Sequence, residues 1–272
     1  MRPLREARGD YEIEVMRDDL VRVLFDSVAK DTEVMFGDAI RSARMDERSV
    51  GVEFDSGLSR EFDVVVGADG QHSALRALAF GPEHDYARQL GAYLSIYTVD
   101  NLLGLRDRTV LYRPTQCDLL RRRFSGMGWE TQRLLDALNG AYDYYFDGMA
   151  QVRLPRWSSG RIGLLGDAAY GPSPLSGEGT SPALIGGYLL AHHLDSASDV
   201  ATAFGRWESG FRASVVQSQR LAALGVPMLV PGSRLGVAVR NQTMRAMPGL
   251  ARLGRGFGGR IESASPSVGM PD

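Results

Sequence analysis

The sequence of 272 residues contains a single cysteine, Cys117, and a single lysine, Lys30. One cysteine cannot form an intrachain disulfide or supply the cysteine set of a structural zinc site. No apolar run is long enough to cross a bilayer, and residues 1–15 carry no apolar signal core. The net charge of −2 gives no reason to expect nucleic acid or an anionic membrane as a partner. We therefore expect a globular protein of a reducing compartment, with a cytoplasmic location.

Hydrophobic periodicity predicts a chain in which strands and helices alternate, which is typical of an α/β fold. Strands are expected at residues 11–15, 32–37, 39–46, 49–54, 63–67, within 88–113, at 142–154 and at 161–166. Helices are expected at residues 17–29, 73–80, 117–141 (in two parts), 180–194 and 200–215. Residues 63–67 form a continuous β-branched run, which is typical of a strand buried on both faces.

Two of the expected helices have clear apolar faces. The apolar face of the first helix consists of Leu20, Val21, Leu24 and Val28. That of the last helix consists of Val200, Phe204, Trp207, Phe211 and Val215. Both sets recur at intervals of three or four residues, apart from one adjacent pair, so each helix is expected to pack through one side.

Residues 161–190 begin as an apolar strand and end as an apolar helix, and Asp167 lies at the turn between them. Four glycines in this turn would let a flat ligand approach the backbone closely. The helix N-terminus would offer unpaired N–H groups and a positive dipole end. A carboxylate there, in what looks like a buried position, could accept hydrogen bonds from ligand hydroxyls. The alternative is an ordinary connection in which Asp167 only caps the turn.

A second strand-turn-helix unit lies at residues 63–76, and it also carries an acid, Asp69, followed by Gly70. Ser73 is placed to cap the helix, and Asp69 could equally be a simple turn former. Arg17 lies at a strand-to-helix junction, where an arginine can reach a phosphate or a ring edge. It could also be a solvated residue of the first helical turn.

The order of these segments resembles the FAD-dependent aromatic-ring monooxygenases, the para-hydroxybenzoate hydroxylase-like family that includes tetracycline-inactivating and polyketide-tailoring enzymes. The shared pattern is Arg-x-x-Leu, then strand-GADG-x-x-Ser-x-x-Arg, then strand-GDAA-x-x-x-x-Pro-x-x-Gly-x-Gly-Thr. The helix with Trp207, Glu208 and Arg212 is similar to the one that follows in the family. The resemblance covers most of residues 11–222.

The resemblance implies an FAD-binding Rossmann-like domain with an interleaved β-sheet substrate domain and C-terminal helices. It places Asp167 on the ribityl chain of FAD, and Asp69 with Gly70 near the pyrophosphate and the nicotinamide cofactor. It implies that Arg17 contacts FAD, and that the flavin ring lies along Pro174, Gly177 and Gly179. The helix that starts at Thr180 would direct its positive end at the flavin, where the reduced ring carries negative charge. The cofactor would be FAD, with NADPH or NADH as co-substrate.

The sequence departs from the family pattern in one major respect. The family opens with a strand and a G-x-G-x-x-G turn that holds the pyrophosphate, and this sequence has no such unit. Its only similar glycine cluster, residues 254–259, follows no predicted strand and opens no helix. We therefore expect a shortened form whose substrate segment is also reduced.

The resemblance divides the chain into three parts. Residues 1–80 and 155–222 would form a discontinuous FAD-binding domain, 81–154 a shortened substrate domain, and 223–272 a helical segment with a loose tail. The expected activity is hydroxylation of a small aromatic or polyketide-like substrate with molecular oxygen. Two alternatives stay open: a non-catalytic remnant of such a flavoprotein, and another kind of FAD-dependent oxidoreductase.

Overall fold

The computed structural model of the chain describes residues 17–28, 30–97, 126, 130–138, 141, 144–174, 179–229, 233 and 235–242. The named helices are α1 (Arg17–Val28), α2 (Ala74–Ala79), the 3-10 helix η2 (Glu83–Asp85), α4 (Thr131–Ala137), α5 (Asp167–Tyr170), α6 (Thr180–Ser196) and α7 (Val200–Leu229). The strands are β1 (Ile40–Met45), β2 (Val50–Phe54), β3 (Ser59–Phe62), β4 (Val65–Gly67), β5 (Ala87–Ile96), β6 (Tyr145–Val152), β7 (Ser158–Ser159) and β8 (Ile162–Leu164).

The strands form three small sheets. The first is an antiparallel meander in the order β1-β2-β3, and the third is the antiparallel pair β5-β6. Between them lies the sheet β4-β8-β7, in which β4 and β8 run parallel and pair Val65 with Ile162 and Gly67 with Leu164. Parallel neighbours need a crossover, and here 94 residues of chain, 68–161, separate the two strands. The carboxyl ends of β4 and β8 therefore meet at one sheet edge.

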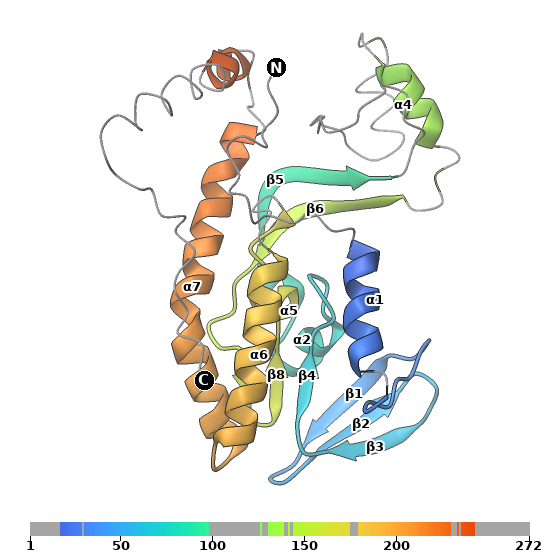
Figure 1. The fold of residues 1–272 in the computed structure, drawn as a ribbon, viewed down its shortest axis with the longest axis vertical. Coiled ribbons are helices and arrows are strands. Elements are labelled where there is room, and N and C mark those ends of the chain that lie inside the picture. Colours follow the sequence, from blue (N-terminus) through green and yellow to red (C-terminus); the bar gives the residue numbers. More distant parts are fainter. Residues whose placement is uncertain are drawn as a thin grey trace.

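Helices α6 and α7 run antiparallel beside this central sheet (Figure 1). The core between them is aromatic: Trp157 packs against Tyr170 at a ring-centroid distance of 4.5 Å and against Trp207 at 5.2 Å. The Trp207 indole donates a hydrogen bond to the Gly186 carbonyl of α6 over 2.9 Å. Large buried rings account for much of the stability of a small core, so this cluster fixes α6 and α7 against β8.

The apolar face predicted for the last helix is confirmed, because Phe204, Trp207, Phe211 and Val215 are buried. The first helix exists too, but its predicted apolar face is not buried: Val21 is 56% exposed, and Leu24 and Val28 are also exposed. Among the described residues no element covers that side of α1. Periodicity identifies a helical face, but it does not identify what the face packs against.

One predicted strand is absent, and the predicted burial of another was wrong. Residues 32–37 were expected to form a strand but form none; Phe36 is 81% exposed and contacts the Phe25 ring instead. The backbone turns at Gly37, where φ is +72°. The strand at 63–67 is present as β4 but is not buried on both faces, since Val66 is 37% exposed. Within the described residues, β4 pairs with β8 alone.

The other predicted elements that fall on described residues are present: β1, β2, β5, β6, β8, α2, α6 and the second helical part at 117–141, which is α4. The predicted strand at 11–15, the later strand-like piece within 88–113 and the first helical part at 117–141 lie outside the described residues. The mixed helix and sheet architecture agrees with the predicted fold class. The division into FAD-binding and substrate domains stays a prediction. No described helix has the length and apolar character needed to cross a membrane.

Candidate functional site

The two acid-bearing turns lie next to each other. Asp69 and Gly70 follow β4, Asp167 follows β8, and the two strands are parallel neighbours. The ladder continues past the strands, because the Leu165 amide donates to the Gly67 carbonyl over 2.8 Å. A side chain at position 67 would collide with Leu164 and Leu75, each 2.9 Å from a built Cβ. Glycine at this position therefore permits the close approach of the two turns.

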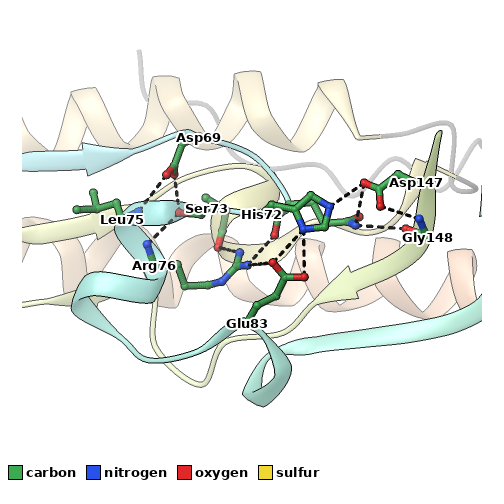
Figure 2. Close-up of polar contacts among 10 residues, drawn as sticks. Asp69, His72, Ser73, Leu75, Arg76, Glu83, Asp147 and Gly148 are labelled. Atoms are coloured by element: carbon green, nitrogen blue, oxygen red, sulfur yellow. Dashed lines mark hydrogen bonds and ion pairs between the residues drawn. The ribbon is translucent and has the colours of Figure 1, made fainter. Parts of the chain in front are cut away.

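The Asp69 carboxylate is used by the helix that follows it (Figure 2). Its Oδ1 accepts from the Ser73 hydroxyl at 2.5 Å and its Oδ2 from the Leu75 amide at 3.0 Å. Ser73 in turn caps α2 by accepting from the Arg76 amide. The predicted capping role of Ser73 is confirmed, and Asp69 is a turn former in this structure. Gly70 follows with φ of +84° and nothing within 4 Å of a built Cβ, so its backbone is open to a ligand.

A buried guanidinium joins the two turns. Arg76 has no exposed surface, and it donates to the Ala168 carbonyl at 3.0 Å and to the Gln71 carbonyl at 2.6 Å. Ala168 belongs to the turn after β8 and Gln71 to the turn after β4, so one side chain bonds both. Burial lowers the pKa of Arg76 from its ordinary value, while the charges of Glu83 and Asp69 act against that shift. The Glu83 carboxylate lies 3.6 Å away.

Asp167 is exposed, so its predicted burial was wrong. It is the first residue of the short helix α5, and Gly166 before it adopts φ of +62°. This turn directs Ala168, Ala169 and Tyr170 into the core and leaves Asp167 at the surface. The apolar residues around Asp167 indicated burial. The turn at Gly166 instead points the Asp167 side chain away from the core, while those of the next three residues enter it.

The loop after α5 is held from two sides by buried glutamines. Gln151 of β6 donates to the Pro172 carbonyl at 3.1 Å, and Gln219 of α7 donates to the Tyr170 carbonyl at 3.2 Å. Sequence reasoning missed both residues. One signal was available for Gln219, which lies four residues beyond Val215 on the buried face of α7. A polar residue on a buried stripe needs hydrogen-bond partners, and here the partner is this loop.

The same loop contains a strained residue. Ser173 is buried and has φ of +88°, the only positive φ of a non-glycine residue among those described. Such conformations cost about 1–3 kcal/mol and occur often at ligand sites. Ser173 immediately precedes Pro174, which is exposed. The chain is therefore held firmly up to the point where the predicted flavin-facing residues begin.

The helix with Glu208 and Arg212 stabilises the approach to β8. Glu208 accepts from the Trp157 amide at 2.9 Å and pairs with Arg212. The Arg212 guanidinium lies 4.7 Å from the Trp157 ring centre and donates to the carbonyls of Leu154 and Pro155. The contacts of this segment are thus with the protein's own chain, and they position β7 and β8.

Three more of the predicted site residues lie at the N-terminal ends of α6 and α1. Gly179 is the N-cap residue of α6, and Thr180 is the first residue of that helix and is exposed. Figure 1 shows the N-terminal ends of α1 and α6 directed toward the end of the molecule that carries β5 and β6. Arg17 begins α1, and its side chain is not described. Gly177 lies outside the described residues.

The described part of this site fits part of a flavin dinucleotide. No described side chain caps the N-terminus of α6, so within the described residues its first N–H groups and positive dipole end face no side-chain acceptor and suit a negative or polar group. A Cβ at Gly179 would meet nothing within 4 Å, which leaves room for a flat ring beside the helix. The described residues do not include a glycine-rich turn that could hold a pyrophosphate. The described residues therefore offer a helix end and open space suited to a flat ring that carries negative charge.

No protein-family model matches the chain. The uncharacterized protein Rv1260 of Mycobacterium tuberculosis is 37% identical over 252 residues, covering 79% of this chain and 68% of the relative. A flavin-dependent monooxygenase of Legionella longbeachae is 35% identical over 249 residues, covering 78% of this chain and 64% of the relative. The chain thus spans about two thirds of the length of these curated relatives.

Two solved structures have the same fold. The tetracycline destructase Tet(55) superposes with a TM-score of 0.70 at 32% identity, over 84% of this chain and 70% of that one. Klebsiella pneumoniae HpxO, solved with FAD and uric acid, superposes with a TM-score of 0.66 at 23% identity, over 85% of this chain and 68% of that one.

These similarities define a class of flavoprotein. The chain belongs to the family of FAD-dependent aromatic-ring monooxygenases, and the resemblance inferred from its sequence motifs is confirmed.

Proposed function

We propose that this chain forms the flavin-binding and substrate-binding core of a monooxygenase that hydroxylates a small aromatic or polyketide-like molecule. The observation that carries this proposal is the pairing of β4 with β8, which brings Asp69, Gly70 and Asp167 to one sheet edge. The N-terminal end of α6 lies toward the same end of the molecule. The names of the relatives support a flavin-dependent oxygenation, and FAD is present in a structure of the same fold.

In this proposal each part of the site has a separate task. Asp167 accepts hydrogen bonds from ribityl hydroxyls, and the N-terminal end of α6 stabilises negative charge on the reduced ring. Asp69 holds the turn after β4 in shape, so that the Gly70 backbone can approach the cofactor. The flavin, when bound, supplies the hydride acceptance and oxygen chemistry. The protein residues bind, orient and stabilise charge, and the reducing co-substrate is NADPH or NADH.

The exposed position of Asp167 makes its role testable without disturbing the core. Replacing Asp167 by alanine removes a charge-assisted hydrogen bond to a ribityl hydroxyl, which corresponds to about 1.5–3 kcal/mol, or roughly ten- to a hundredfold in FAD affinity. The matched control is Asp195→Ala, at an exposed position near the other end of α6. FAD titration followed by flavin fluorescence measures all three proteins.

The proposal predicts weaker FAD binding for D167A alone. Equal affinities in D167A, D195A and the unaltered chain would leave Asp167 as a turn residue with no cofactor contact. With FAD added, oxidation of NADPH or NADH that is stimulated by an aromatic substrate would support the hydroxylase activity. FAD binding without any such oxidation would instead favour the non-catalytic alternative.

A further inference from the structure

His72 lies between two carboxylates that come from different parts of the fold. It is in the turn after β4, two residues beyond Gly70. Its Nδ1 is 2.9 Å from the Glu83 carboxylate of η2, and its Nε2 is 2.9 Å from Asp147 Oδ2 of β6 (Figure 2). Eleven residues separate His72 from Glu83 and 75 separate it from Asp147. The histidine therefore joins the turn after β4 to the β5-β6 sheet.

Each ring nitrogen of His72 faces a carboxylate oxygen, so both nitrogens are placed to donate a hydrogen bond. Asp147 Oδ2 also accepts from the Tyr145 hydroxyl at 3.1 Å and from the Gln71 amide at 3.3 Å, and its Oδ1 accepts from the Gly148 amide. In each of these contacts the carboxylate is the acceptor, so the ring nitrogen that faces it serves as a donor. A neutral imidazole has one N–H, and an imidazolium has two. The geometry is therefore that of a charged ring between two carboxylates.

The surrounding charges act in the same direction. Hydrogen bonds to Glu83 and then to Asp147 raise the pKa of His72, against a smaller opposing effect of burial. The Arg76 guanidinium also faces Glu83, at 3.6 Å. Within the described part of the chain, the Tyr145 hydroxyl, the Gln71 side-chain amide and the Gly148 backbone amide also donate to Asp147. Among the described residues, no group of histidine and acid side chains could hold a metal ion.

We propose that His72 is a positioning residue, whose imidazolium ties the Asp69–Gly70 turn to β6, and that this tie weakens when the ring loses its proton. The turn carries the backbone that is proposed to approach the cofactor, and β6 carries Gln151, which holds the loop before Pro174. The contact thus holds the Asp69–Gly70 turn and β6 at a fixed position relative to each other. That this positions the cofactor rests on the proposed function, but the contact between His72, Glu83 and Asp147 does not.

The direction of the pH effect follows from the raised pKa. A histidine whose pKa is raised on folding stabilises the folded form below its unfolded value of about 6.5. That contribution is lost as the pH rises through the folded value. His193 acts in the opposite sense because burial and the charge of His192 lower its pKa. Every variant in the test therefore keeps His193, so that its contribution to the pH dependence is the same in each protein.

Hydrogen–deuterium exchange of the full chain tests the tie without flavin. The variants are His72→Gln, which cannot carry the charge, and the control His84→Gln, whose side chain is 82% exposed beside Asp85. After correction for intrinsic exchange, protection at residues 69–75 and 145–149 should fall about two- to tenfold between pH 6 and pH 9 in the unaltered chain. H84Q should behave the same, and H72Q should lack this pH dependence.

A second measurement keeps the proposal testable if H72Q fails to fold. Asp147→Asn retains an acceptor oxygen but removes one charge, so the NMR titration midpoint of the His72 ring should fall. Protection at 145–149 should fall with it. An H72Q exchange profile that follows the unaltered chain at every pH would overturn the proposal, as would a D147N midpoint that does not move.

Flavin binding separates this proposal from the proposed function. If FAD binds, its affinity should fall about two- to tenfold from pH 6 to pH 9 in the unaltered chain and in H84Q, but not in H72Q. An affinity with the same pH dependence in H72Q would refute the positioning role. If no protein binds FAD, the proposed function fails, and the exchange experiment still decides whether His72 ties the turn to β6.

Discussion

Replacing Arg76 by methionine tests whether the two acid-bearing turns are held together by one buried side chain. Methionine has a similar length but no donors, so the carbonyls of Ala168 and Gln71 lose their hydrogen bonds. A buried polar group left without a partner costs about 1–3 kcal/mol. Two carbonyls lose a partner, and the cost of both is partly offset because the substitution also removes a buried charge, which burial alone disfavours. We expect a loss of about 2–4 kcal/mol in the free energy of unfolding.

Urea unfolding followed by tryptophan fluorescence measures this change, because Trp157 and Trp207 are both buried. The control is Arg206→Met, at an exposed position on α7, where a substitution should stay within about 0.5 kcal/mol. Arg76→Lys should be intermediate, because lysine keeps the charge but lacks the fork of donors that reaches two carbonyls. Equal stability of R76M and R206M would refute the view that Arg76 joins the turns.

Two further outcomes follow from the structure and the sequence. Gly186→Ala should destabilise the fold by about 1–3 kcal/mol in the same urea experiment, because its Cβ would lie 2.1 Å from the hydroxyl of the buried Tyr170. The control is the neighbouring Gly187→Ala, where the nearest atom is 3.5 Å from the Cβ. This substitution should stabilise the fold by about 0.5–1 kcal/mol. A polypeptide of these 272 residues should purify with little FAD, since its sequence has no strand followed by a G-x-G-x-x-G turn; a stoichiometric flavin absorbance band in the purified protein would contradict this.

The secondary structure that periodicity predicts is mostly what the fold contains, and the failures have a common cause. Residues 32–37 form no strand and pair with none of the described strands, and α1 has an apolar face that no described element covers. Periodicity measures only whether one side of a segment is apolar. Pairing and packing depend on segments far away in the sequence, so a correct period can still give a wrong strand or an uncovered face.

The candidate site was predictable where its residues are neighbours in the sequence. Ser73 as the cap of α2 and Thr180 as the start of α6 follow from local chemistry. The contacts that position the site are different, because Arg76 reaches Ala168 across 92 residues and Gln219 reaches Tyr170 across 49. No local pattern encodes such a distance. The sequence identified the turns, and the structure was needed to identify what holds them.

The two acids at the sheet edge have similar sequence settings but different surroundings, and one residue explains the difference. Four positions after Asp69 comes Ser73, whose hydroxyl donates to that carboxylate. Four positions after Asp167 comes Gly171, which has no side-chain donor, and a Cβ there would lie 2.9 Å from Asp167 Oδ1. Because a Cβ at position 171 would collide with Asp167, glycine lets this carboxylate lie against the backbone of its own turn, whereas serine binds the first carboxylate through its hydroxyl. Asp69 therefore shapes its turn through the cap of the helix that follows, and the cofactor contact proposed for Asp167 is what the D167A titration tests.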